Sequence, residues 1–175
     1  MPLPHDPAQG PPKLDEPHTS IVRESLPVDA ARAFEMFTRS TELVRWFCDQ
    51  ADSQEQPNGE VHASWLDEDG EAWDRVGRWI AFEPPHLAVL EWFEVETAPP
   101  TADGPSETDQ PLPPARRDIL RIAIAPEEEG GCTVTVMSPL LQSGTALRGD
   151  IAAEAVRHGW RMAFAELRIL LGDPG

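Results

Sequence analysis

The order of elements along this chain predicts an α+β fold, in which helices and strands are segregated rather than alternating. A strand and two short helices come first, a run of strands follows, and one long amphipathic helix comes last. Period-2 alternation of apolar residues predicts strands with one buried face, and helical spacing predicts a helix that packs on them. The 175 residues are enough for a single domain with a sizeable core.

Two helices are predicted after the first strand. In residues 28–40, VDAARAFEMFTRS, apolar residues recur at helical spacing, and Asp29 is the expected N-cap. Residues 41–47, TELVRWF, predict a second short helix capped by Ser40 or Thr41. This second helix ends in two large aromatic residues and leads directly into a polar segment. Such a pair needs an apolar surface to pack against.

Six segments predict strands of an antiparallel sheet, separated by turn signals such as Asn58-Gly59, DEDG and EEEGG. The segments are 19–26, 60–67, 72–82, 87–96, 118–125 and 132–138. The alternation predicts inward faces formed by Val61, Ala63 and Trp65, by Ala88, Leu90 and Trp92, by Leu120, Ile122 and Ile124, and by Val134 and Val136.

The last predicted helix spans residues 145–173 and has one apolar stripe. The stripe consists of Val156, Trp160, Ala163, Leu167 and Leu170. Charged residues occupy the opposite face, so this helix is expected to lie on the sheet.

Two proline-rich segments are expected to be irregular, because proline fixes φ and removes a backbone donor. Residues 1–18 hold six of the 19 prolines, and residues 97–117 hold six more. We expect a disordered tail at 1–18 and a single domain at 19–172, with 97–117 as a long loop inserted between two strands.

Charge and composition argue against several functions. The net charge of −17 disfavours nucleic acid or an anionic membrane as partner. Lys13 is the only lysine and tyrosine is absent, which excludes a Schiff-base lysine or a tyrosine acid in the predicted domain. Cys48 and Cys132 are isolated, so no metal or cofactor is expected. Without a signal segment or a spanning apolar run, we expect a cytoplasmic protein.

No catalytic residue is assigned from the sequence. It contains no nucleophile–base–orienter set, no G-x-S-x-G elbow and no glycine-rich phosphate loop before a helix. His62 alternates away from the apolar face of its strand, and His158 lies on the polar side of the last helix. Both histidines are therefore expected to face solvent.

Four segments together resemble the START-like (SRPBCC) superfamily, in particular the branch named after the activator of the Hsp chaperone ATPase. They are ARAFEMFTRSTELVRWF, PNGEVHASW, GRWIAFEPPHLAVLEWF and HGWRMAFAELRILL. The chain departs from the usual pattern with Asn58 in place of a glycine, Ala81 in place of a glutamate, and a longer loop at 97–117. The resemblance implies a helix-grip fold, a curved sheet of about six strands wrapped on the C-terminal helix.

The resemblance also implies a cavity between that helix and the sheet, with Trp46 and Phe47 closing its mouth. The expected ligand-binding residues are Trp46, Phe47, Val61, Ala63, Trp65, Leu90, Trp92, Ile122, Val136, Trp160 and Phe164. These aromatics either line a pocket for an apolar or aromatic ligand or fill a closed core.

Three functions remain open at this point. The first is binding of a small hydrophobic or aromatic molecule without catalysis. The second is a polyketide cyclase or aromatase, which needs ionisable groups facing the cavity, with Asp49 and Arg121 as weak candidates. The third is a co-chaperone, but the named activators carry a further N-terminal domain, which the tail at 1–18 does not resemble. A homodimer is also left open.

Overall fold

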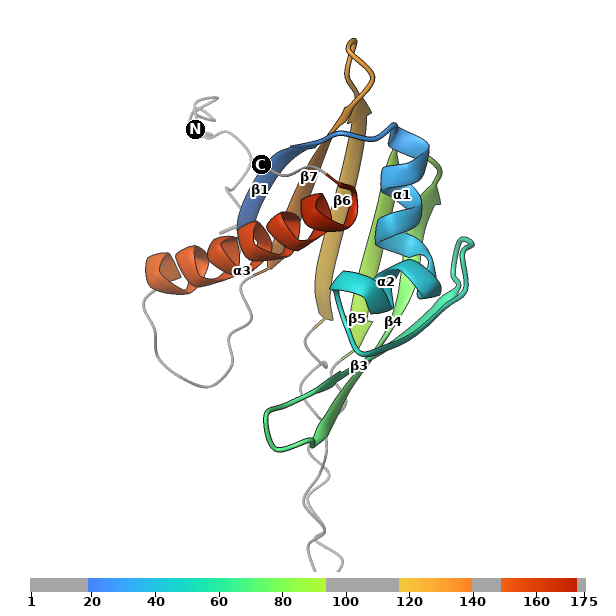
Figure 1. Ribbon diagram of the computed structural model, residues 1–175. Coiled ribbons are helices and arrows are strands. Elements are labelled where there is room, and N and C mark those ends of the chain that lie inside the picture. Colours follow the sequence, from blue (N-terminus) through green and yellow to red (C-terminus); the bar gives the residue numbers. More distant parts are fainter. Residues whose placement is uncertain (1–18, 94–116, 140–148, 173–175) are drawn as a thin grey trace, which may run out of the picture.

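The computed structural model describes residues 19–93, 117–139 and 149–172, which form one curved sheet with all three helices on one of its faces (Figure 1). Their seven strands are antiparallel and lie in the order β1-β7-β6-β5-β4-β3-β2. The elements are β1 (Thr19–Leu26), α1 (Ala30–Thr38), α2 (Ser40–Trp46), β2 (Gln50–Ser53), β3 (Glu60–Leu66), β4 (Ala72–Glu83), β5 (Leu87–Phe93), β6 (Arg117–Pro126), β7 (Cys132–Pro139) and α3 (Gly149–Leu170). The predicted α+β fold is confirmed.

The N-terminus of α1 is capped as predicted, and that of α2 is not. The backbone N–H of Arg32 donates to Asp29 Oδ1 at 2.7 Å, which satisfies one of the free donors of the first turn. Arg39 is the N-cap of α2 and makes no side-chain capping bond. The hydroxyl of Ser40 instead accepts from the backbone N–H of Ser53 at 2.8 Å, so it joins α2 to β2.

In four strands the residues predicted to face inward are more buried than most of their neighbours, although Glu91 on β5 is buried as well. The inward residues of β5, β6 and β7 and the first two of β3 are all buried, and Trp65 is half-buried. The sequence missed β2, which is short, polar and at the sheet edge. In β4 the register shifts between Trp79 and Ala81, so a bulge there breaks the alternation.

Helix α3 lies across the sheet on its predicted stripe. Phe164 and Leu167 are fully buried against the core, and Trp160 is half-buried beside them. His158 is exposed, as is His62 on β3, which agrees with the expectation for both histidines.

Some predictions concern parts of the chain that the structure does not describe. These are the tail at 1–18, nearly all of the loop at 97–117, residues 94–96 of one predicted strand, and residues 145–148 and 173 of the last predicted helix. In the ranges that are described, no helix is both long and apolar enough to cross a membrane.

Candidate functional site

A cavity between α3, α2 and the sheet is divided into two compartments. The inner compartment measures about 20 Å³, which is room for one water molecule, and the outer compartment measures about 270 Å³. The inner one is lined by Phe37, Leu43, Trp46, Phe47, Val61, Ala63, Trp79, Leu90, Trp92, Leu120, Ile122 and Trp160. The outer one is lined by Phe47, Trp65, Trp73, Arg75, Trp92, Asp118, Leu120, Ser138, Val156 and Trp160.

All six tryptophans of the chain line one or both compartments. Trp46 and Trp79 belong to the inner compartment, and Trp65 and Trp73 belong to the outer one. The remaining two, Trp92 and Trp160, lie on the boundary and line both. The tryptophan side chains of this protein are therefore concentrated around a single space.

Phe47 forms the partition between the compartments together with α3. Its ring stacks on that of Trp160 with centroids 6.2 Å apart and an interplanar angle of 18°. On the other side it meets Trp65 edge to face at 5.3 Å. Trp46 packs mainly on α1 instead, with its ring 5.0 Å from that of Phe37. The two aromatics that end α2 thus have different roles: Phe47 divides the cavity, and Trp46 fastens α2 to α1.

Three of the indole N–H groups have partners within the protein. Trp46 Nε1 donates to the Met36 carbonyl at 2.9 Å, and Trp65 Nε1 donates to the Phe47 carbonyl at 2.6 Å. Trp79 Nε1 donates to the hydroxyl of Ser53 on β2 at 3.1 Å. These bonds orient the rings, so the walls are set by hydrogen bonds as well as by packing.

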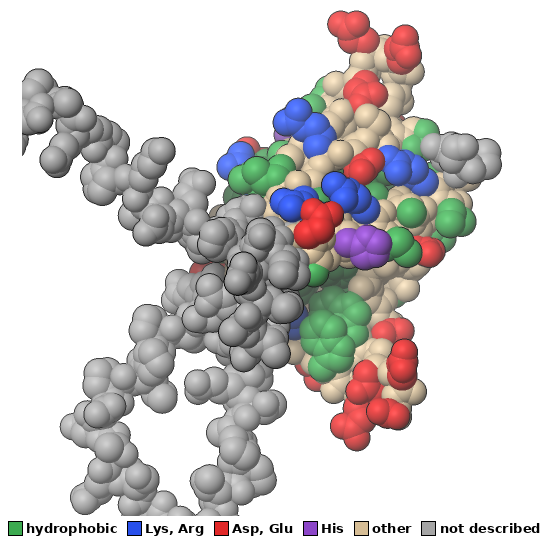
Figure 2. Space-filling view, turned by 90° about the vertical axis from the view of Figure 1, so that its left-hand side faces the viewer, with side chains coloured by type: hydrophobic (Ala, Val, Ile, Leu, Met, Phe, Trp, Pro, Cys, Tyr) green, Lys and Arg blue, Asp and Glu red, His purple; other side chains and the backbone are tan. Residues whose placement is uncertain are grey.

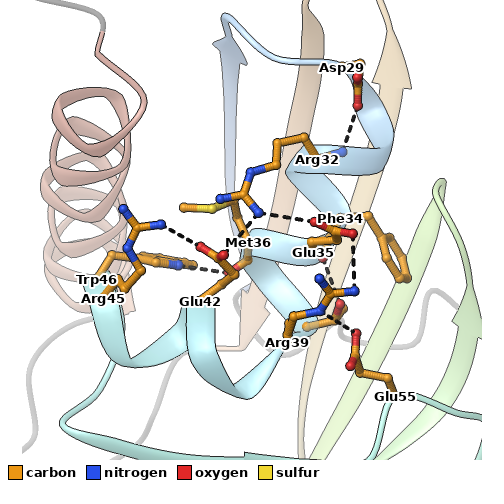
Figure 3. Close-up of polar contacts among 11 residues, drawn as sticks. Asp29, Arg32, Phe34, Glu35, Met36, Arg39, Glu42, Arg45, Trp46 and Glu55 are labelled. Carbon is orange, nitrogen blue, oxygen red and sulfur yellow. Dashed lines mark hydrogen bonds and ion pairs between the residues drawn. The ribbon is translucent and has the colours of Figure 1, made fainter.

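A network of ion pairs holds α2 against α1 at the inner end (Figure 3). Arg32 Nη1 lies 3.1 Å from Glu35 and 3.0 Å from Glu42, and Arg45 Nη1 reaches Glu42 at 3.0 Å. Burial raises the pKa of Glu42, but hydrogen bonds from Arg32 and Arg45 outweigh it, and the net pKa lies below the ordinary value. Glu42 therefore stays ionised and joins the two helices at neutral pH.

The outer compartment contains an ion pair that spans three strands. Arg75 on β4 and Asp118 on β6 both face inward, and Arg75 Nη2 lies 2.8 Å from Asp118 Oδ2. The guanidinium crosses the β5 strand between them, with its Cζ 5.1 Å from the ring centroid of Trp92. Both charged side chains are about three-quarters buried, with 22% and 24% exposed.

Gly77 makes room for this arrangement. It pairs with Trp92 across β4 and β5, and a Cβ built on it would lie 2.9 Å from Trp92 Cε3 and 2.6 Å from the Glu91 carbonyl oxygen. Both distances are too short for any side chain to be added without moving the neighbouring strand. The missing side chain lets the Trp92 ring lie across β4, where Arg75 covers it.

From the side, hydrophobic side chains gather below the arginine-bearing surface of α3 and above the acidic tip of the β3–β4 hairpin (Figure 2). Trp73, on this hairpin, is 51% exposed and stacks on Trp65 with centroids 4.3 Å apart and an interplanar angle of 14°. The rim of the outer compartment is therefore aromatic and partly accessible to solvent.

Most of the residues expected at the cavity do line it. Eight line the inner compartment: Trp46, Phe47, Val61, Ala63, Leu90, Trp92, Ile122 and Trp160. Trp65 lines the outer one. Val136 and Phe164 line neither compartment and are fully buried in the core.

The two weak acid–base candidates do not reach the cavity. Asp49 is exposed, and its Oδ2 accepts from the backbone N–H of Leu66 at 2.8 Å, which orders the start of β2. Arg121 is exposed on the outer face of β6. The ionisable pair inside the compartment is Arg75 with Asp118, which sequence reasoning missed. The available signal was one charged residue in phase with the inward positions of each strand, Asp118 two residues before Leu120 and Arg75 two residues after Trp73.

The two cysteines are free and buried. Burial raises the pKa of both the Cys48 and the Cys132 thiol to about 11, so each is protonated at neutral pH. Across the described part of the chain, no three His, Cys, Asp or Glu side chains lie close enough together to hold a metal ion.

Known structures share this fold at low sequence identity. A protein from Rhodobacter sphaeroides matches with 16% identity over 90% of this chain and 93% of that chain, with a TM-score of 0.66. A protein from Nitrosomonas europaea matches with 17% identity, 91% and 97% coverage and a TM-score of 0.63. The AHSA1 protein from Silicibacter pomeroyi matches with 13% identity, 88% and 97% coverage and a TM-score of 0.60. At these identities the likeness shows the fold alone.

The family is shown by the sequence. No curated protein matches the chain. A family model described as "Activator of Hsp90 ATPase homolog 1-like protein" matches residues 27–172, which covers every element from α1 to α3. This confirms the resemblance drawn from the four sequence segments, and the chain belongs to the Activator of Hsp90 ATPase homolog 1-like family.

Proposed function

We propose that this protein binds a small hydrophobic or aromatic molecule in the outer compartment, between α3 and the sheet. The observation that supports this is the compartment itself, about 270 Å³ in volume and lined by four tryptophans with few polar groups. Binding sites for small molecules are typically concave, mostly apolar and roughly 300–1,000 Å³ in volume. The outer compartment is close to that range, and the inner one, at about 20 Å³, is far below it.

The partition sets the size of the ligand. A molecule of one or two fused rings fits in the outer compartment with Phe47 and Trp160 in place. A longer molecule requires one of these two rings to turn, which opens the way to the inner compartment. Rotation of Phe47 breaks ring contacts but leaves its backbone carbonyl bonded to Trp65.

The test is calorimetric titration of the protein with 2-naphthamide, a neutral bicyclic probe. We expect saturable binding at one site, weakened at least tenfold by Val156→Arg, which places a long charged side chain in the outer compartment. Met162→Arg is the matched control, since it adds the same side chain to an exposed position of α3. Absence of binding to the wild type, or equal binding by Val156→Arg, would contradict the proposal.

A second candidate is catalysis on a reactive chain held in the same compartment, as in a polyketide cyclase or aromatase. The observation that favours it is that Arg75 and Asp118 are two ionisable groups facing the cavity. In such a reaction Asp118 would act as a base and Arg75 would stabilise an enolate. Exchange of the α-protons of a bound aryl β-diketone, followed by NMR in D₂O, tests this. If proton exchange is no faster with the wild-type protein than with the Asp118→Asn variant, this candidate is removed.

A further inference from the structure

We infer that the outer compartment selects a ligand with a carboxylate, and that Arg75 binds this carboxylate within that compartment. The inference rests on the proposed function and names the chemical class of its ligand: a flat aromatic acid. It is carried by the arrangement of Arg75, Trp92 and Asp118, which joins a fixed guanidinium to an aromatic wall.

The Arg75 guanidinium has N–H groups that a ligand can bind. A guanidinium carries five N–H groups in a planar fork, and among the described residues Arg75 donates one hydrogen bond, from Nη2 to Asp118. Arg75 lines the compartment, and the geometry of its fork matches a carboxylate better than it matches a single hydroxyl or carbonyl oxygen. A ligand acid can therefore bind without first breaking the bond to Asp118.

The guanidinium is also held in position before any ligand arrives. It lies over the face of Trp92, and it is tied to a strand two places away in the sheet. Because Arg75 is already fixed by these contacts, the protein loses less conformational freedom when a ligand binds. The space left by Gly77 fixes the position of Trp92, so the acid site and the aromatic wall have a defined separation.

The same contacts disfavour a cationic ligand. Arg75 already occupies the face of Trp92 that a ligand cation would otherwise use, and the Asp118 carboxylate in the compartment is already paired with Arg75. The net charge of −17 opposes an anion at long range. That long-range field is screened over about 8 Å at physiological ionic strength, whereas a contact with the largely buried guanidinium of Arg75 is screened much less.

The test compares 2-naphthoate with 2-naphthamide, two probes of almost equal shape that differ in charge, by calorimetric titration at neutral pH. With the wild type we expect naphthoate to bind about tenfold more tightly than naphthamide. Arg75→Gln should remove this preference, so that the two probes bind the variant with affinities within about threefold of each other. Arg121→Gln, which removes an arginine from the outer face of the sheet, should leave the preference intact.

The outcomes separate the inference from the function on which it rests. If neither probe binds the wild type, the proposed function fails and the inference fails with it. If naphthamide binds and naphthoate binds no more tightly, or if Arg75→Gln keeps the preference, only the inference is overturned. Should Arg75→Gln unfold, Arg75→Lys serves instead, because it keeps the charge but loses the fork. A reduced preference for naphthoate in the lysine variant supports the inference, and an unchanged one overturns it.

Discussion

Tryptophan lies at both ends of the cavity, but it is buried at the inner end and exposed at the outer end. At the inner end Trp79 is 1% exposed and bonded to Ser53, and the neighbouring helices are joined by ion pairs. At the outer end Trp73 is 51% exposed and is held by stacking on Trp65. An indole with a hydrogen-bonded N–H and no solvent contact contributes to stability, whereas an exposed indole at a cavity rim offers a surface to a ligand. The contrast assigns stability to the inner end, and under the proposed function it leaves ligand recognition to the outer end.

The largest effect on stability is expected from Trp79→Ala at the inner end. This change removes a fully buried ring and the bond to Ser53, so the free energy of unfolding should fall by about 3–5 kcal/mol. Urea unfolding followed by far-UV circular dichroism measures it. A loss below about 1 kcal/mol would show that the inner end is not the stabilising one.

Trp160 lies on the boundary between the two ends, and Trp160→Ala is expected to have an intermediate effect on the free energy of unfolding. The ring is half-buried and lines both compartments, so fewer packing contacts are lost and the cost should be roughly 1–3 kcal/mol. The variant should stay folded and bind 2-naphthamide more weakly. A severely destabilised variant would place Trp160 in the core instead of the cavity wall.

Glu42→Gln tests the ion-pair network that holds α2 on α1. The pKa of Glu42 lies below its ordinary value of 4.5, so its carboxylate stabilises the fold above that pH and loses this effect as the pH falls through the lowered folded-state pKa. We expect the variant to be about 1 kcal/mol less stable at pH 7, with the difference shrinking below about pH 4.5. Thermal unfolding across that pH range measures the difference.

Glu166→Gln is the control for Glu42→Gln, since Glu166 is an exposed carboxylate on α3. It should change stability little at any pH. If Glu42→Gln lowers stability equally at every pH, the packing of the Glu42 side chain, and not its charge, holds the two helices together.

Trp73→Ala is expected to have the smallest effect on stability. Because the ring is half-exposed and stacks on one neighbour, the free energy of unfolding should change by less than about 1 kcal/mol. Affinity for 2-naphthamide should nevertheless fall several-fold, which calorimetry measures. A large stability loss with unchanged affinity would reverse the roles assigned to the two ends.

Much of the fold was predictable because the strands that enclose the core carry apolar residues at every second position of their inward face. Period-2 alternation in β3, β5, β6 and β7 is therefore enough to identify their inward residues from the order of amino acids alone. The edge strand β2 has no such signal, since its four residues are mostly polar. The α2 cap was missed because Ser40 bonds to β2, a contact distant in sequence.

The site was less predictable, for reasons found in β4. Before its bulge, the inward positions of β4 are Trp73, Arg75, Gly77 and Trp79. The arginine and the glycine interrupt the apolar pattern between the two tryptophans, so Trp73 and Trp79 were not assigned to the inner face. Arg75 and Asp118 occupy inward positions that the pattern reserves for apolar residues, and 43 residues separate them in sequence. Their pairing depends on the strand order, which a sequence pattern does not specify.

All six tryptophans line one cavity, and the chain has no tyrosine. The intrinsic fluorescence of the protein therefore reports on this cavity. The ultraviolet emission of the described domain arises entirely from indoles that line either compartment. Ring separations of 4.3 Å between Trp65 and Trp73 and 6.4 Å between Trp65 and Trp92 are short enough for excitation to pass between neighbours. A molecule that enters the outer compartment would therefore dim or shift the emission of the connected set, so occupancy can be followed without a label.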